Sequence, residues 1–197
     1  MTDGQIEKEA NMRVIAGTAR SMPLKTPEGP NTRPTTDRIK ETLFNMLHWD
    51  VQGAVFVDLF SGSGAIGIEA LSRGARKAYF VENAPKALDC IRQNLTFTNL
   101  QNHAIVIKQD VCGGLAAISD EAVDIVFMDP PYGQGHEKNV MAVLKDRSYV
   151  TEDTVIIVEA SLETDFSWLD EMGFSLEKEK LYKTNKHVFI KRASGQQ

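Results

Sequence analysis

The sequence DLFSGSGAIG, residues 58–67, decides the fold class, because it sets a glycine-rich turn between an apolar strand and a helix. The apolar segment Ala54–Leu59 leads into the turn and predicts a strand, and Ala65–Arg73 follows and predicts a helix. The turn matches the pattern GxGxxG, in which glycines let the backbone approach a bound cofactor closely. A strand, turn and helix of this kind form a crevice for an adenosine-containing cofactor.

Outward from this turn, short apolar segments alternate with helical ones. Pro85–Leu100 predicts a second helix, with its apolar residues along one face. Apolar strands that alternate with helices are typical of a parallel sheet covered on both faces. The tail, Ser175–Tyr182 and His187–Lys191, predicts a closing hairpin. We therefore predict a doubly wound α/β fold with a mostly parallel sheet and a C-terminal antiparallel β-hairpin. The other candidate strands are Ala78–Val81, Ala104–Lys108, Asp124–Met128 and Thr154–Glu159.

The bulk composition limits the class of protein. A chain of 197 residues, 42% hydrophobic and 25% charged, fits one soluble α/β domain. No apolar run approaches the roughly 20 residues of a membrane span, and the polar, acidic first dozen residues are unlike a signal peptide. The two cysteines, Cys90 and Cys112, form no CxxC pattern and predict no disulfide. The expected compartment is therefore a reducing cytoplasm.

The net charge of −5 is distributed unevenly. From Arg13 to Lys40 the balance is +4, which leaves −9 for the rest of the chain. A basic arm can contact nucleic-acid phosphates, although a flexible, solvated arm explains the pattern equally well. We expect a disordered extension at 1–11, a basic arm with a helix that packs on the core at 12–50, and the cofactor-binding domain at 51–194. The candidate nucleic-acid contacts are Arg13, Arg20, Arg33, Arg38 and Lys40.

Asp58 distinguishes two cofactor classes at the glycine turn. In a dinucleotide site the pyrophosphate docks against the helix N-terminus, and an adjacent carboxylate would repel it. S-adenosylmethionine carries a sulfonium and an ammonium instead of phosphate, so Asp58 would attract it, directly or through the backbone geometry that it sets. Glu82 is placed to accept both ribose hydroxyls and Asp110 to reach the adenine amino group, with Val111 packed on the ring. The predicted cofactor-binding residues are Asp58, Phe60, Gly62, Ser63, Gly64, Glu82, Asn83, Asp110 and Val111.

The segment Asp129-Pro130-Pro131-Tyr132, after the fourth candidate strand, indicates the chemistry. The exocyclic amine of a nucleic-acid base is a poor nucleophile, because its lone pair is delocalised into the ring. The Asp129 carboxylate and the Pro130 carbonyl can accept its two hydrogens and free that lone pair to attack a methyl group. The prolines restrict the backbone, so these acceptors are preorganised, and Tyr132 offers a face for base stacking. We take all four residues as catalytic candidates.

These motifs together resemble the class I S-adenosylmethionine-dependent methyltransferases, which have a Rossmann-like fold and a DPPY motif. Three N-terminal segments, MRVIAGTAR (12–20), LKTP (24–27) and RPTTDRIKETLFNML (33–47), are similar to the RsmD family of bacterial 16S ribosomal RNA guanine-N2 methyltransferases. This resemblance covers the chain from Met12 to about Arg192. It implies that residues 51–194 are the methyltransferase domain and that a guanine N2 in the small ribosomal subunit, or in its assembly intermediate, is the target.

The resemblance also implies that the arginines of the arm contact RNA phosphates or order the arm over the cofactor, and that Tyr132 stacks through its ring. We expect no metal, because the histidines have no ligand-like spacing, and no membrane partner. His136 and Glu137 follow glycines, which favours a solvated loop. Three alternatives remain open: a DNA adenine or cytosine amino-methyltransferase, a dinucleotide-dependent oxidoreductase and a non-catalytic RNA-binding module.

Overall fold

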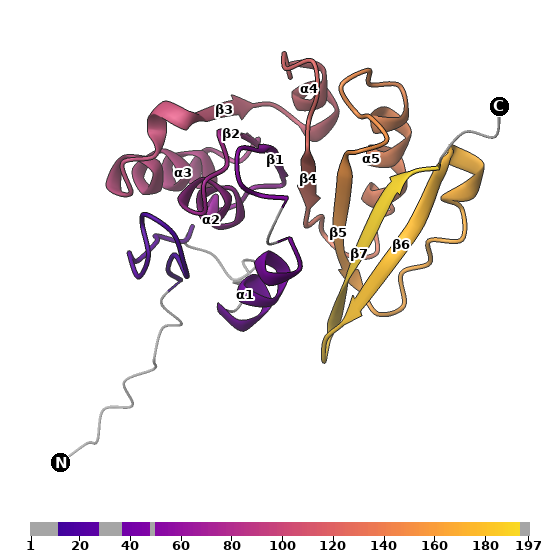
Figure 1. Ribbon diagram of the computed structural model, residues 1–197, viewed down its shortest axis with the longest axis horizontal. Helices are drawn as coiled ribbons and strands as arrows, with labels where there is room; N and C mark the ends of the chain where they lie inside the picture. The colour runs from indigo at the N-terminus through magenta and orange to yellow at the C-terminus, as the bar shows by residue number, and fades with distance from the viewer. Residues whose placement is uncertain (1–11, 28–36, 48–49, 194–197) are drawn as a thin grey trace.

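A computed structural model of the chain describes residues 12–27, 37–47 and 50–193. Seven strands form one sheet in the order β3-β2-β1-β4-β5-β7-β6 (Figure 1). The strands are β1 (Val55–Leu59), β2 (Lys77–Glu82), β3 (Ala104–Lys108), β4 (Ile125–Met128), β5 (Val155–Ser161), β6 (Phe174–Leu181) and β7 (Asn185–Arg192). The helices are α1 (Asp37–Met46), α2 (Ala65–Ser72), α3 (Pro85–Phe97), α4 (Val111–Ala116) and α5 (His136–Lys145), with 3-10 turns η1 (Gln101–His103) and η2 (Asp170–Met172).

The strand directions confirm the predicted fold class. Strands β1 to β5 pair in parallel, whereas β7 is antiparallel to both β5 and β6. The hairpin therefore extends the sheet through its second strand, with β6 at the outer edge. Asn185 and Lys186 belong to β7, although the sequence places them in the turn of the hairpin. The sequence also gives no signal for α4, because VCGGLA contains two glycines, which are poor helix formers.

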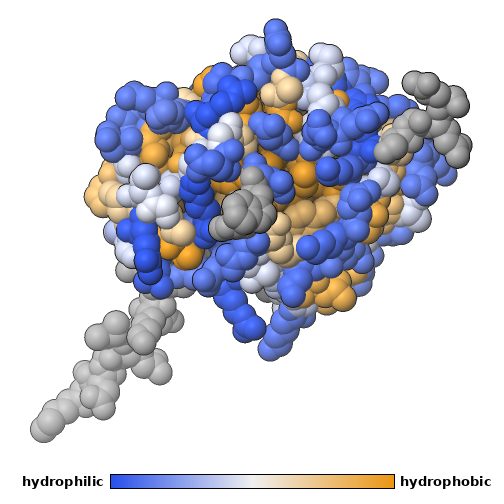
Figure 2. Space-filling view, viewed as in Figure 1, coloured by the Kyte–Doolittle hydropathy of each residue, from blue (hydrophilic) through white to orange (hydrophobic). Residues whose placement is uncertain are grey.

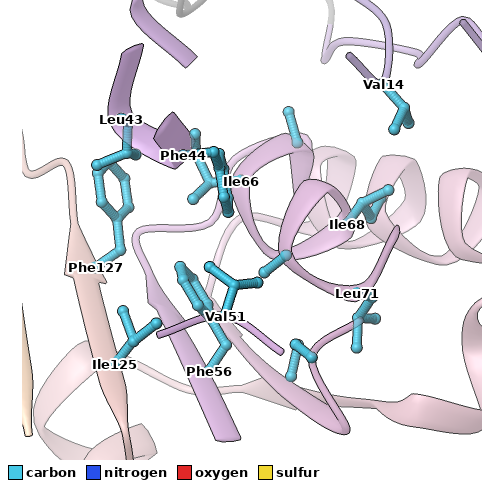
Figure 3. Packing of buried hydrophobic residues seen from close by; sticks show 14 of the residues in the cluster. Val14, Leu43, Phe44, Val51, Phe56, Ile66, Ile68, Leu71, Ile125 and Phe127 are labelled. Atoms are coloured by element: carbon cyan, nitrogen blue, oxygen red, sulfur yellow. The ribbon is translucent and has the colours of Figure 1, made fainter. Parts of the chain in front are cut away.

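The helices form two layers, one on each face of the sheet (Figure 1). On one face, α1, α2 and α3 share a buried apolar cluster with alternate residues of the strands. Leu43 and Phe44 of α1 lie beside Phe127 of β4 and Ile66 of α2 (Figure 3). On the other face, α4 and α5 cover the remaining strand residues, which form a second cluster. Because strand residues alternate between faces, each strand contributes to both cores.

The segment at 12–27 is held on α2 and α3 by buried polar side chains. The Glu69 carboxylate of α2 accepts hydrogen bonds from the backbone N–H groups of Ile15 (2.8 Å) and Ala16 (3.0 Å). Asn94 of α3 both accepts from the backbone of Lys25 and donates to it. These contacts satisfy backbone groups that lie outside regular structure, as burial requires. The described part of the arm is therefore anchored to helices α2 and α3.

The prediction that Lys40 contacts nucleic acid is wrong. Its side chain is fully buried, lies 3.4 Å from the Glu69 carboxylate and donates a hydrogen bond to the carbonyl of Arg13. Burial lowers the pKa of Lys40, and the neighbouring Glu69 opposes that shift. Lys40 lies on the face of α1 that also carries buried Leu43 and Phe44. Its ammonium group therefore points into the core, where it pairs with Glu69 and joins α1 to α2.

In the part of the chain that the structure describes, no helix combines the length and apolar character needed to cross a membrane.

Candidate active site

Asp58 shapes the glycine turn through the backbone. Its carboxyl group is 2% exposed, and its Oδ2 accepts a hydrogen bond of 2.9 Å from the N–H of Gly67, in the first turn of α2. Burial raises the pKa of Asp58 well above its ordinary value; the Gly67 hydrogen bond opposes this rise, and the nearby charges of Asp129 and Glu82 add to it. Of the two roles that the sequence allows, this geometry favours control of the backbone.

The turn that follows β1 is strained at one non-glycine position. Phe60 adopts a φ of 57°, in the left-handed region that side chains avoid. Gly67 has a different requirement, because a Cβ atom there would come within 2.4 Å of the Phe80 ring. Its missing side chain lets α2 approach β2 closely, which sets the start of the helix against the ends of the strands.

Glu82, at the end of β2, ties three backbone N–H groups together. Its Oε2 accepts from Gly62 (2.9 Å), and its Oε1 accepts from Asn83 and Ala84 (2.8 Å each). The carboxylate thus links the glycine turn to the start of α3. A carboxylate offers about four acceptor positions, so one remains for a ligand hydroxyl beside these three bonds.

A cavity of about 300 Å³ opens at the carboxyl ends of these strands. It brings together several of the predicted cofactor-binding residues, and Asp110 caps α4 there by accepting from the N–H of Gly113 at 2.8 Å. Asp58, Ser63 and the glycines of the turn do not line it. The predicted residues that line the cavity are Phe60, Glu82, Asn83, Asp110 and Val111.

Other lining residues escaped the sequence analysis. His136, which we expected in a solvated loop, begins α5, and its ring lies 5.7 Å from the ring of Phe60. Asn139 and Val140 of the same helix complete that wall. The helical spacing from 136 to 140 is the signal that could have revealed it, because such residues share one face.

The lining of the cavity fits S-adenosylmethionine better than a dinucleotide. Within the described residues, the lining contains two acids, amides, apolar groups and one histidine, and the two carboxylates would repel a pyrophosphate. Glu82 and Asp110 offer acceptors in a lining that also includes apolar Val81 and Val111. An adenosine without phosphates presents hydroxyl and amino donors and a flat apolar ring, and these match that lining.

The DPPY segment follows β4, next to Asp58. Asp58 pairs with Phe127 between β1 and β4, so Asp129 follows two residues after that pair, and its charge adds to the rise in the pKa of Asp58. Pro130 is buried, Pro131 is exposed, and the Tyr132 hydroxyl donates to Oε1 of Glu159 at 3.3 Å. The four residues predicted as catalytic therefore lie between the cofactor strands and the later strands of the sheet.

A buried polar cluster around Glu159 was not found from the sequence. Glu159 lies near the end of β5 and accepts from Asn185 Nδ2 (2.6 Å) and His187 Nε2 (3.1 Å), both in β7. The Tyr182 hydroxyl lies 3.1 Å from His187 Nδ1. Burial raises the pKa of Tyr182 to about 12, and Glu159 adds to that rise. In the sequence, Glu159 ends the apolar segment Thr154–Glu159, just as Glu82 directly follows the apolar segment Ala78–Val81. This shared position is the signal that could have revealed Glu159.

The predicted nucleic-acid contacts on the arm have different environments. The side chains of Arg13, Arg20 and Arg38 are exposed, and Arg13 Nε also bonds to Asp37 at 2.8 Å. Arg33 lies outside the described residues. Figure 2 shows hydrophilic residues over α1 and over the β6–β7 hairpin, with an apolar patch between them.

The strand order, the acidic residues near the ends of β1 and β2, and a cavity whose described lining contains neither Lys nor Arg are those of a class I methyltransferase that uses S-adenosylmethionine. The solved structure of an Escherichia coli protein described as "Putative methyltransferase yhhF" superposes with a TM-score of 0.79 and 32% identity, covering 94% of this chain and 99% of that one.

Relatives of known sequence narrow the class. The chain is 35% identical to "Ribosomal RNA small subunit methyltransferase D" of Escherichia coli K12, over 86% of this chain and 84% of that protein. It is 37% identical to "Putative rRNA methyltransferase YlbH" of Bacillus subtilis 168, over 78% and 85% respectively. The family model "Conserved hypothetical protein 95" matches residues 12–191. The chain therefore belongs to this family, the RsmD/YlbH methyltransferases.

Proposed function

We propose that this protein methylates the exocyclic N2 amine of a guanine in 16S ribosomal RNA of the small ribosomal subunit, of the guanine-966 type. The observation that carries the proposal is the position of Asp129-Pro130-Pro131-Tyr132 directly after β4, which pairs with β1 at Asp58, and within hydrogen-bond reach of Glu159 on β5. The names of the two relatives support ribosomal RNA as the substrate.

The residues of this chain contribute alignment and electrostatics. Bound S-adenosylmethionine supplies a methyl group that its own sulfonium already activates. The Asp129 carboxylate and the Pro130 carbonyl accept the two amine hydrogens, so the nitrogen lone pair points out of the base plane. Because the prolines hold both acceptors in place, little reorganisation accompanies the reaction. The Tyr132 ring supports an unstacked base, an interaction that contributes about 1–3 kcal/mol.

The exposed arginines of the arm supply a route for RNA docking. Arg20 and Arg38 lie on segments that Glu69 and Lys40 fasten to the core, so their positions relative to the site are constrained. Phosphate contacts orient a nucleic acid without recognising its sequence. In this proposal the arm orients the RNA, and the end of β4 performs the chemistry.

The experiment is methyl transfer from labelled S-adenosylmethionine to small subunits isolated from cells that lack this gene. We expect one labelled nucleoside, N2-methylguanosine, in the 16S RNA, and no label on subunits from cells that carry the gene. Naked 16S RNA and plain duplex DNA are the comparison substrates. Label in duplex DNA alone would identify a DNA amino-methyltransferase. Tight NAD binding without affinity for S-adenosylmethionine would replace the proposal with an oxidoreductase.

A further inference from the structure

The cluster around Glu159 lies beside the segment 129–132 that we propose as catalytic. Met128, the last residue of β4, pairs with Val158 of β5, and Asp129 and Glu159 are the next residues along the two segments. His187, opposite Glu159 on β7, contacts the ring of Phe127, two residues before Asp129. Glu159 therefore lies on the same face of the sheet as Phe127, next to the catalytic turn.

Glu159 has acceptor capacity left over. Its Oε1 accepts from Asn185 at 2.6 Å and from Tyr132 at 3.3 Å, and its Oε2 accepts only from His187, at 3.1 Å, among the described residues. A carboxylate provides about four acceptor positions. The Tyr132 contact is also long for a hydroxyl donor, for which about 2.7–2.8 Å is usual. A ligand donor can therefore use Oε2 directly or replace the tyrosine.

Asn185 adds a second acceptor. Its side chain is 4% exposed, and its Oδ1 has no hydrogen-bond partner among the described residues. The orientation of the amide is determined, because Nδ2 must face the Glu159 carboxylate to donate to it. A buried acceptor without a donor is unfavourable and rare in native structures, and a functional role is one explanation for it. The cluster thus lacks a donor, and a ligand can provide one.

We propose that Glu159, held by Asn185 and His187, recognises the N1–H of the target guanine and so selects guanine over other bases that carry an amine. The inference rests on the proposed function. Guanine is the base in which the exocyclic amine adjoins a ring N–H. In adenine and cytosine, the ring nitrogen beside the amine is an acceptor, which a carboxylate repels. With the amine held at Asp129, the next group along the base edge meets Glu159.

The test replaces the target nucleoside by one that keeps the amine and loses the ring N–H. The substrates are small subunits reconstituted with ligated 16S RNA that carries either guanosine or 2,6-diaminopurine riboside at the mapped position. Both bases have the 2-amino group, but ring N1 of diaminopurine is an acceptor. We expect the wild-type protein to prefer guanosine by at least about 100-fold in kcat/KM, because the analogue leaves the buried carboxylate without a donor.

The variant Glu159→Gln is nearly isosteric, and its amide can donate to ring N1. We expect it to lower the preference for guanosine to below about 10-fold, with S-adenosylmethionine affinity unchanged by calorimetry. The matched control is Glu179→Gln, a half-exposed carboxylate on β6 that pairs with Lys186. It should keep the full preference.

Two outcomes would overturn the inference: a wild-type preference within about threefold, or a Glu159→Gln variant that keeps the wild-type ratio. If Glu159→Gln fails to fold, the wild-type ratio alone decides. Wild-type protein that leaves the guanosine particle unmethylated would refute the proposed function instead, so the two failures are distinguishable.

Discussion

The two halves of the crevice are built by different kinds of contact. In the cofactor half, Asp58 near the end of β1 and Glu82 at the end of β2 accept hydrogen bonds from backbone N–H groups of the glycine turn and the helix starts beside it. In the substrate half, Glu159 accepts from side chains of Tyr132, Asn185 and His187. The first arrangement holds the shape of a loop, whereas the second holds a set of polar side chains together, which we propose face the target base.

This difference predicts which property of the protein a substitution in each half will change. A carboxyl group bound to the backbone affects folding and cofactor binding together, because the turn depends on it. A carboxylate bound to side chains affects selection of the substrate, and the sheet beneath it stays intact. The following substitutions separate these effects, from the largest expected effect to the smallest.

Asp129→Ala should break catalysis and leave the cofactor half unchanged. Removing one preorganised acceptor should lower kcat about 1,000-fold, an effect of about 4 kcal/mol. Single-turnover transfer to small subunits measures the rate, and calorimetry measures S-adenosylmethionine affinity, which should change less than threefold. A fully active variant would remove Asp129 from the mechanism.

Lys40→Met should destabilise the protein through the layer of helices. The substitution keeps the length of the buried side chain but leaves Glu69 without the cation at 3.4 Å. We expect a loss of about 3 kcal/mol in the free energy of unfolding in urea, because a buried charge loses its partner. The Arg73 contact at 2.7 Å partly compensates. An unchanged midpoint would contradict the anchoring role.

Asp58→Asn should change how stability depends on pH. Because burial raises the pKa of Asp58 in the folded state, the folded protein holds a proton that the unfolded chain releases above about pH 3.8. The contribution of this group is complete below that pH and declines as the pH rises toward the folded pKa, by up to about 1.4 kcal/mol per unit.

Asn cannot ionise, so the variant should lack this slope while its carbonyl still accepts from Gly67. Urea unfolding of both proteins from pH 4.5 upward measures the difference. Parallel pH curves would show that Asp58 ionises in the folded protein as it does in the unfolded chain.

Replacing Arg20 and Arg38 together by Ala should weaken RNA binding and spare both halves of the crevice. Each lost phosphate contact should reduce the slope of log affinity against log salt by about 0.7–0.9. Binding of 16S RNA fragments across a salt series gives the slope. If the slope equals that of the wild type, Arg20 and Arg38 do not contact RNA phosphates and are simply solvated.

Local segments account for what could be predicted. The turn at 58–67 and the segment at 129–132 each hold their chemistry within a few consecutive residues, so spacing was enough to find them. The doubly wound sheet and its closing hairpin also followed from alternation, because burial on both faces makes a parallel strand apolar throughout. Helix α4 escaped, since its two glycines hide a segment that Asp110 caps.

The sequence by itself determined the class of fold, the glycine turn and the segment 129–132 that we propose as catalytic. Only the tertiary structure decided that β7 lies between β5 and β6, that Lys40 faces the core, and that Asn185 and His187 meet Glu159. The physical reason is distance along the chain. Glu159 bonds to residues that lie 26 and 28 positions further along the chain, on another strand. Such bonds depend on the register of the two strands, and register is set by the packing of the whole sheet.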